Sequence, residues 1–422
     1  MQLLTSLLER LAPGLPRSVW LLQVGGFANA FGNGIAFPFL LIYLHNVRGV
    51  SLGVAGLIAG TNALVGMVAG PVAGTLVDRL GSKRVLMGSL VMLAVGFGSY
   101  PLVHEAWQGF VVAGIAGIGN GAFWPAHSSL VGGLAAPERR HAAYALQRVS
   151  NNLGIGLGGV AGGLIASTDR PGSFTVLFLV DAATFLVFVG VLARIRSSDP
   201  FAFHQTKADR EVEPGRYIDV LRHGVFVRVV LLNALFISVG YAMFDLLPVF
   251  AKNDAGVSER QIGLIFLANT LLIVLVQMPV TRRLEGRRRM PALAFMGAIF
   301  GLSWLVVLGG GLTLEGVAAT IAFSAALAIF GLGECIHGTI QTALSVDLAR
   351  PHLMGRYMAL SAFSWQLGMG IGPAAGGFLL AASPTALWLS AAGVCGAGSV
   401  GALLLERRLP RAALRTPAAA AV

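Results

Sequence analysis

The sequence predicts an all-α membrane protein with twelve transmembrane helices in two pseudo-symmetric bundles of six helices. Three observations support this fold class. The 422 residues are 55% hydrophobic and 12% charged, whereas a soluble domain has about a quarter charged residues. Twelve apolar runs are each long enough to cross ~30 Å of hydrocarbon, which takes ~20 helical residues. The second half of the chain also repeats the glycine pattern of the first half.

The apolar runs follow one another with short polar connections. Because no water reaches the backbone inside a bilayer, runs of this length have to be helical. They cover residues 19–44, 53–76, 85–103, 110–134, 143–167, 174–193, 229–250, 261–281, 291–309, 316–344, 357–381 and 386–405. Residues 1–17 include Glu9 and two prolines but no long apolar core, which predicts a cytoplasmic amphipathic segment and no cleavable signal.

The longest polar interruption, residues 194–228, divides the spans into six and six. Its acidic residues, proline and glycine give it the composition of a linker. We therefore expect a cytoplasmic N-terminal segment at 1–17, a first bundle at 18–193, a cytoplasmic linker at 194–228, a second bundle at 229–405 and a cytoplasmic tail at 406–422.

The basic residues predict the orientation in the membrane. With a cytoplasmic N-terminus, 26 of the 30 Lys and Arg residues lie inside, and Arg48, Arg170, Lys252 and Arg260 remain outside. Because cytoplasmic loops are enriched in these residues, we expect an integral protein of the cytoplasmic (inner) membrane with both termini inside. The formal charge of +11 then belongs to short loops, which argues against a nucleic-acid partner.

The two halves repeat in sequence. A shift of 214 residues superimposes glycines of the first half on glycines of the second: Gly117 on Gly331, Gly119 on Gly333, Gly154 on Gly368, Gly158 on Gly372, Gly162 on Gly376 and Gly163 on Gly377. Parallel repeats of six helices are typical of transporters that bind substrate between the halves near the bilayer midplane. Neither a channel nor a membrane enzyme needs this architecture.

A short charged segment, residues 74–86, overlaps the junction of the second and third apolar runs. It contains Gly74, Asp78, Arg79, Gly81, Lys83 and Arg84. The pattern resembles the loop between helices 2 and 3 of the major facilitator superfamily, Gly-x-Leu-x-Asp-Arg-x-Gly-x-Lys, with Ser82 where a basic residue is common. The resemblance implies the major facilitator fold, with these residues as a conformational switch. An ordinary basic cytoplasmic turn is the alternative.

The resemblance suggests a mechanism for Asp78. Helix 11 is predicted to begin near Gly355 and Arg356, and its positive N-terminal end would attract the Asp78 carboxylate across the boundary between the halves. That contact would close the inner side. The corresponding loop of the second half, 282–289, has Arg283 in the place of Asp78 when Gly286 is aligned with Gly81.

Glycines at a spacing of four occur in helices 5 and 11. They are Gly154, Gly158, Gly162 and Gly163 in helix 5, and Gly368, Gly372, Pro373, Gly376 and Gly377 in helix 11. The pattern resembles a family motif typical of exporters, although Gly159 replaces the motif's proline in helix 5. Such spacing allows two backbones to approach closely, and Pro373 can bend its helix. We expect both helices to pack against helices of the opposite half; generic small-residue packing is the alternative.

Few ionisable groups fall inside the spans, where they are costly and therefore functional candidates. The proton-coupling candidates are Glu334, His337, Asp245 and Asp181. Glu334 is preferred because His337 and Gln341 follow it on the same helix face. A Glu–His pair that only satisfies itself is the alternative. The arginine that proton-coupled exporters of the family often have in helix 4 is Ala113 here.

Polar and aromatic side chains inside the spans are candidates for a substrate cavity. These are Asn29, Asn33, Asn120, Trp124, His127, Gln341 and Trp365. Tryptophan suits flat, apolar or cationic ligands, although ordinary packing explains many such rings.

The chain resembles most closely the drug–proton antiporter branch of the superfamily. This implies export of small amphipathic or cationic compounds by a functional monomer, with the proton as coupling ion and no cofactor or metal. The sequence has no phosphate-binding loop and no Ser-His-Asp or metal-ligand set, so neither an ATP-driven pump nor an enzyme is expected. Two alternatives remain open: a proton-coupled symporter of one metabolite, and a non-transporting membrane sensor.

Overall fold

The computed structural model describes residues 15–136, 139–195, 217–350 and 353–416. In these residues each of the twelve predicted runs coincides with a long helix or with consecutive helices, and no strand occurs. The all-α membrane fold is therefore confirmed. Ten helices are long and apolar enough to span a membrane. Two further long helices, α7 and α16, are not among them, since glycine and polar side chains replace large apolar ones there.

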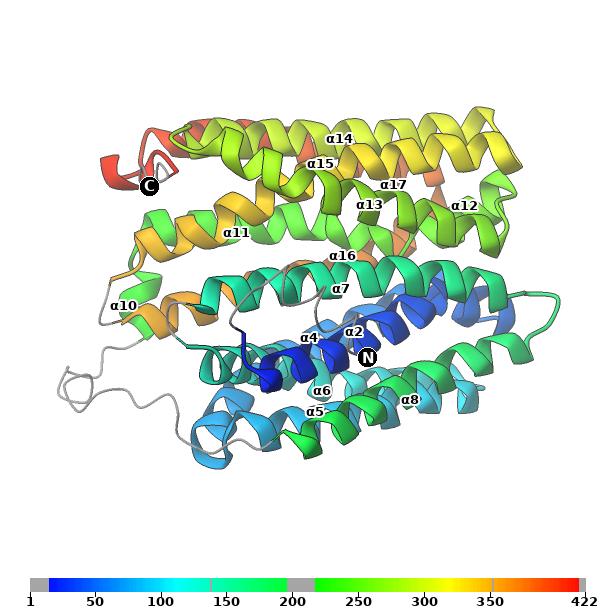
Figure 1. Ribbon diagram of the computed structural model, residues 1–422. Coiled ribbons are helices and arrows are strands. Elements are labelled where there is room, and N and C mark those ends of the chain that lie inside the picture. Colours follow the sequence, from blue (N-terminus) through cyan, green and yellow to red (C-terminus); the bar gives the residue numbers. More distant parts are fainter. Residues whose placement is uncertain (1–14, 137–138, 196–216, 351–352, 417–422) are drawn as a thin grey trace. The chain divides into compact units, whose positions relative to one another are not determined.

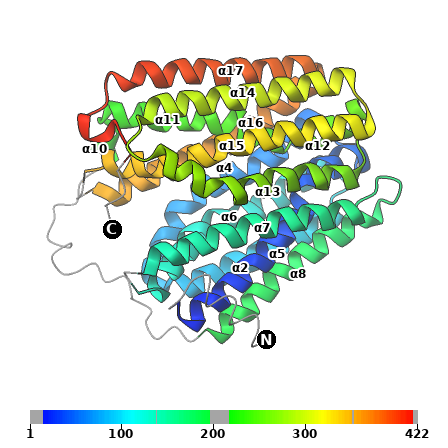
Figure 2. The ribbon, with the colours of Figure 1, turned by 45° about the horizontal axis from the view of Figure 1, so that its top comes forward.

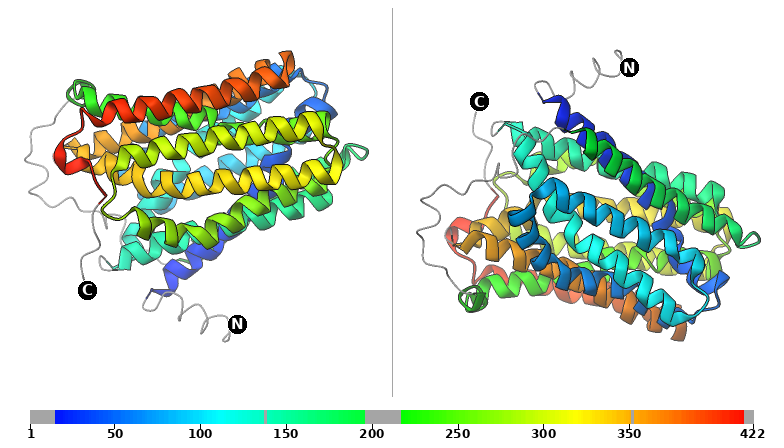
Figure 3. Two further views of the ribbon diagram at one scale, coloured as in Figure 1. Left: turned by 90° about the horizontal axis from the view of Figure 1, so that it is seen from above. Right: turned by 90° about the horizontal axis from the view of Figure 1, so that it is seen from below.

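The described chain forms two compact units, which are Met1–Phe39 with Thr61–Gln205, and Leu40–Gly60 with Thr206–Val422. The helices from α2 to α8 are α2 (Arg17–Ala36), α3 (Leu40–Ile42), α4 (Leu52–Leu80), α5 (Ser82–Ser99), α6 (Ala106–Leu134), α7 (Arg140–Ile165) and α8 (Gly172–Arg194). Helix α4 is continuous and contributes to both units. Helix α5 packs beside α6 and α8, and the right view of Figure 3 shows α5 (light blue) next to α6 (cyan).

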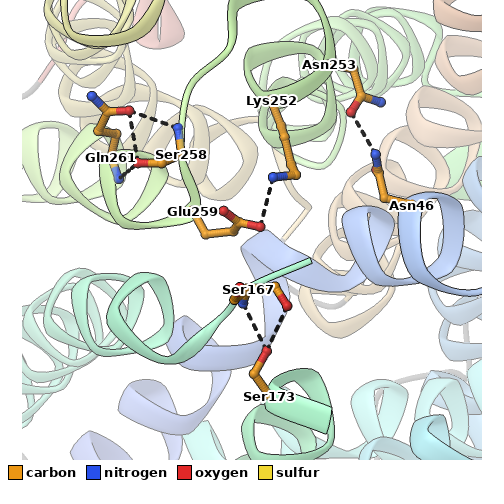
Figure 4. A network of polar contacts seen from close by, with 8 residues as sticks. All are labelled: Asn46, Ser167, Ser173, Lys252, Asn253, Ser258, Glu259 and Gln261. Carbon is orange, nitrogen blue, oxygen red and sulfur yellow. Dashed lines mark hydrogen bonds and ion pairs between the residues drawn. The ribbon is translucent and has the colours of Figure 1, made fainter. Parts of the chain in front are cut away.

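The second unit contains the remaining helices. These are α10 (Tyr217–Leu221), α11 (Gly224–Val239), α12 (Leu247–Ala255), α13 (Glu259–Leu284), α14 (Arg289–Thr313), α15 (Gly316–Leu348), α16 (Met354–Ala382) and α17 (Pro384–Glu406). In Figures 1 and 2, α14 runs beside both α15 and α17. A capping box begins α13: Ser258 Oγ accepts from Gln261 N, and Gln261 Oε1 accepts from Ser258 N at 2.8 Å (Figure 4).

Two turns confirm the predicted alignment of Gly81 with Gly286. Gly81 separates α4 from α5 with φ 85°, and Gly286 separates α13 from α14 with φ 69°. Residues with a Cβ avoid this region of φ. Both loops therefore need glycine for the same reason, at equivalent points of the two halves.

The glycine stripes pack helices inside one half, so the expectation of packing against the opposite half is wrong for most of them. A Cβ on Gly158 would lie 2.0 Å from Phe31 O in α2, and a Cβ on Gly372 would lie 2.3 Å from Ala242 Cβ. Gly154 and Gly162 likewise face α2. The spacing correctly predicts close approach, but the partner is a helix of the same half: α2 for the glycines of α7, and α11 with the turn after it for Gly368 and Gly372 of α16.

Gly377 is the exception among these glycines, because a Cβ there would lie 2.7 Å from Leu52 O at the start of α4. Gly56 and Gly60 similarly face the backbone of α16. This packing explains why residues 40–60 group with the second unit, although the sequence prediction assigns them to the first bundle. Asn46 Nδ2 also donates to Asn253 Oδ1 at 2.7 Å, close to the Lys252–Glu259 ion pair (Figure 4).

Candidate functional site

Glu334 and Asn269 form a polar pair inside the second unit. Asn269 Nδ2, in α13, donates to Glu334 Oε2 in α15 at 2.7 Å and to Leu327 O at 3.1 Å. Gly331, one helical turn before Glu334, gives room for this approach, since a Cβ there would lie 3.1 Å from Asn269 Nδ2. The carboxyl group of Glu334 is thus held against a neighbouring helix by an amide donor.

The first unit contains an equivalent pair without an acid. Asn120 Nδ2, in α6, donates to Asn62 Oδ1 in α4 at 2.8 Å. Gly117 precedes Asn120 by one turn, and a Cβ on it would lie 2.5 Å from Asn62 O. The repeat that aligns Gly117 with Gly331 also aligns Asn120 with Glu334. The two halves therefore share one helix-to-helix polar bridge, and of the two only the second-unit bridge can titrate.

His337 belongs to a chain of hydrogen bonds next to this pair. Its Nε2 lies 2.8 Å from Asn233 Oδ1, and its Nδ1 lies 3.1 Å from the Tyr241 hydroxyl. Asn233 Nδ2 donates to Ser364 Oγ at 2.7 Å, and Ser364 Oγ donates to Ser361 O at 2.6 Å. Because Asn233 Oδ1 can only accept, the proton of a neutral His337 lies on Nε2 and Tyr241 donates to Nδ1.

The helix that carries Asn233 is broken beside this chain. α11 ends at Val239, Gly240 has φ −103° and ψ −91°, and a 3₁₀ turn covers Tyr241–Phe244 before α12. The indole Nε1 of Trp304 donates to Val239 O at 2.7 Å, which satisfies one carbonyl that the break releases. Asp245 follows the turn and is buried. Interrupted spans of this kind line substrate sites in transporters.

One exposed tryptophan lies beside the hydrogen-bond chain of His337, and another lies beside His127. Trp365 is 40% exposed, and its ring centroid lies 4.8 Å from that of Tyr241. Trp124 is 50% exposed and meets the His127 ring edge-on. Gln341 is buried in α15, and its Nε2 has no hydrogen-bond partner among the described residues. Both tryptophan rings are therefore only partly covered by the side chains around them.

In the first unit, His127, Asn29 and Asn33 do not join one hydrogen-bond network among the described residues. His127 Nδ1 lies 2.7 Å from Gln147 Nε2, and its Nε2 has no hydrogen-bond partner among the described residues. Asn29 is buried, and its Oδ1 likewise has no hydrogen-bond partner among the described residues. Asn33 is half-buried.

Asp181 has the most enclosed carboxyl group in this set. It is 0% exposed in α8, and within the described chain neither carboxyl oxygen has a hydrogen-bond partner. A Cβ on Gly32 of α2 would lie 2.7 Å from Asp181 Oδ1. An unpaired buried charge is very costly, so Asp181 stands out among the acids of the spans.

The switch motif occupies the end of α4 and the start of α5. Asp78, Arg79 and Arg84 are exposed, Gly74 is half-buried, and Lys83 Nζ donates to Ile195 O at 2.8 Å. Asp78 has no ion pair or side-chain hydrogen bond in the part of the chain that the structure describes. The predicted attraction between Asp78 and the start of helix 11 stays a prediction.

Asp78→Asn should lower the transport rate severalfold without lowering the yield of folded protein. The side chain is exposed, so its packing contributes little to stability, while the substitution removes the charge that would bind a helix N-terminus. Uptake into liposomes and size-exclusion chromatography measure the two effects. Asp169→Asn, at an exposed acid in the loop before α8, is the matched control. An Asp78→Asn protein that transports like the wild type would disprove the switch role.

Sequence reasoning missed Asn62, Asn269, Asn233, Tyr241 and Ser364. The signal was a lone polar residue inside an apolar run, which identifies candidates but not their partners. Among the described residues no group of three His, Cys, Asp or Glu side chains could hold a metal ion.

Comparison with known proteins agrees with the fold. The family model of the Major Facilitator Superfamily matches residues 22–371 and, in a second match, 246–421. The uncharacterized MFS-type transporter YqjV of Bacillus subtilis is 24% identical over 364 residues, which are 86% of each chain. The multidrug resistance protein MdtH of Cronobacter sakazakii is 25% identical over 385 residues, covering 90% of this chain and 92% of that protein.

Solved structures of transporters have the same fold. A crystal structure of the peptide transporter POT with sulfate superimposes with a TM-score of 0.77 at 17% identity, covering 95% of this chain and 96% of that one. The inward-open xylose transporter XylE from E. coli gives 0.72 at 15% identity, with 93% and 95% covered. The family and these relatives are transporters and not enzymes. With its apolar spans, repeated halves and matching family model, the chain is an integral membrane transporter that belongs to the Major Facilitator Superfamily.

Proposed function

We propose that this transporter exports small amphipathic or cationic compounds in exchange for protons, by alternating access between inward- and outward-open states. The observation that carries the proposal is Glu334. It is a half-buried acid in the middle of a span, at a position whose counterpart in the other half is the amide Asn120. An ionisable group at that depth is costly, which makes it a functional candidate.

The exposed aromatic rings support the substrate class. Trp365 with Tyr241, and Trp124 with Phe123, offer flat apolar faces, and such faces attract organic cations. The MdtH relatives, which are multidrug resistance proteins, favour the same class. The distribution of basic residues supports an inner-membrane location with both termini in the cytoplasm.

The test is transport by the purified protein in liposomes with an imposed pH gradient. The probes are fluorescent cationic and neutral amphiphiles, and protein-free liposomes give the background. We expect cationic amphiphiles to move in the direction opposite to the proton flow, and this movement to stop when an ionophore collapses the pH gradient.

A proton-coupled symporter of one polar metabolite is the second candidate. The hydrogen-bond chain from Tyr241 to Ser361 favours it, because such a chain can recognise a polar ligand. In the same liposomes a symporter would move sugars, amino acids or peptides with the proton gradient and leave the amphiphiles untouched. A sensor would move neither group of compounds.

A further inference from the structure

A group of exposed arginines lies where α13 and α17 end in the second unit. From α13 and the following turn they are Arg282, Arg283 and Arg287, and from the chain after α17 they are Arg407, Arg408, Arg411 and Arg415. These seven residues are called the arginine platform below. In the two segments 282–290 and 406–416, Glu285 is the only exposed acid.

Backbone pairing holds the two arginine-bearing segments together. Arg288 and Arg415 form an antiparallel bridge. Thr416 N donates to Arg287 O at 3.0 Å, and Gly286 N donates to Thr416 O at 3.2 Å. Figure 1 shows the C-terminal segment (red) beside the ends of α13 and α14. The backbone segments that carry the arginines are therefore held side by side before any ligand binds, which lowers the entropy cost of binding.

The neighbouring acids are already paired with other arginines. Arg289 is 0% exposed, and its Nη2 lies 2.5 Å from Asp347 Oδ2. Arg288 Nε lies 2.7 Å from Glu406 Oε1. None of the seven platform arginines has an ion pair within the described ranges. The charge of the platform is thus left for an external anion.

The platform lies at the edge of the predicted hydrocarbon region. Candidate spans end at Leu284 and Glu406, and another begins at Arg289. One helical turn deeper, the helices expose apolar side chains: Met278 precedes Arg282 by four residues and is 60% exposed, and Leu404 precedes Arg408 by four residues and is 59% exposed. In α13 an apolar side chain therefore lies on the same face as an arginine, one turn further into the membrane, and in α17 Leu404 lies in the last turn before Arg407 and Arg408.

We propose that the arginine platform binds the headgroups of anionic phospholipids. Guanidinium groups match the geometry of phosphate and bind it through paired hydrogen bonds. The apolar side chains beneath the arginines offer contact to acyl chains, which a soluble phosphate compound lacks. This combination of groups favours a lipid as the occupant.

The test is native mass spectrometry of the full-length purified protein titrated with phosphatidylglycerol. Phosphatidylcholine is the zwitterionic control, and glycerol 3-phosphate is the soluble control. In Arg407→Gln/Arg408→Gln/Arg411→Gln/Arg415→Gln we expect the apparent affinity for phosphatidylglycerol to fall at least about tenfold. The matched control, Arg139→Gln/Arg194→Gln/Arg222→Gln/Arg228→Gln, removes four exposed arginines elsewhere and should keep it.

A second variant tests the fixed turn separately. Gly286→Val keeps every platform arginine but places a Cβ at φ 69°, so it should also weaken phosphatidylglycerol binding while size-exclusion chromatography reports on folding. Equal losses in both quadruple variants would overturn the proposal, because binding would then follow net charge alone. Binding of glycerol 3-phosphate at the same concentrations would overturn the assignment to lipid.

Discussion

Glu334→Gln should reduce proton-driven transport to the level of protein-free liposomes while the protein remains folded. Glutamine has the shape of glutamate and can still accept from Asn269 Nδ2 through its side-chain oxygen. It cannot take up or release a proton. The first unit already holds two helices together with an amide–amide pair, Asn120 and Asn62, at 2.8 Å. The substitution therefore converts the second-unit bridge into the kind that the first unit tolerates.

The measurement compares uptake with and without a pH gradient. Glu315→Gln is the matched control, because it changes an exposed acid just before the first turn of the same helix and should transport like the wild type. Downhill exchange of substrate without a gradient should survive in Glu334→Gln, since the variant loses only the coupling. If gradient-driven uptake persists, the proton must be carried by Asp245 or Asp181 instead.

Gly158→Ala should destabilise the folded protein by an amount near the upper end of the ~1–3 kcal/mol that overpacking costs. The new Cβ would lie 2.0 Å from Phe31 O, and a backbone carbonyl cannot move aside as a flexible side chain can. Helices α2 and α7 would have to separate, and the close contacts along their whole interface would weaken.

Gly114→Ala is the control for this prediction. Gly114 is in α6 and has no atom within 4 Å of an added Cβ, and alanine favours a helix over glycine by ~1 kcal/mol. Thermal unfolding followed by fluorescence-detected size-exclusion chromatography should give a clearly lower midpoint for Gly158→Ala, and an unchanged or higher one for Gly114→Ala. Equal midpoints would mean that α2 and α7 are packed less closely than described.

The sequence predicts those features of the fold that depend on residues close together along the chain. Apolar length predicts the spans, and Gly81 and Gly286 were correctly aligned because each loop needs a positive φ. The spacing of Gly154 and Gly158 correctly indicated close helix contact. Spacing describes only one face of one helix, however, and the identity of the helix on that face depends on the fold. This is why the predicted partner in the opposite half was wrong for Gly154 and Gly158, although Gly377 does face α4.

In the candidate site, too, the sequence identifies individual residues but not their partners. Glu334 and His337 were identified because polar groups stand out in an apolar run. Their partners Asn269 and Asn233 lie 65 and 104 residues away, and no local pattern connects such distant positions. Single candidate residues can be identified from the sequence, but the hydrogen bonds among them depend on the fold.

The hydrogen-bond chain through His337 has a direction. Tyr241 donates to His337, His337 to Asn233 and Asn233 to Ser364, so every donor points the same way. A proton added to Nδ1 would turn that atom from acceptor into donor, and the Tyr241 hydroxyl would then have to rotate. The Tyr241 ring packs against the exposed Trp365. Protonation of His337 would therefore reorient the hydroxyl of a tyrosine whose ring lies against an exposed tryptophan.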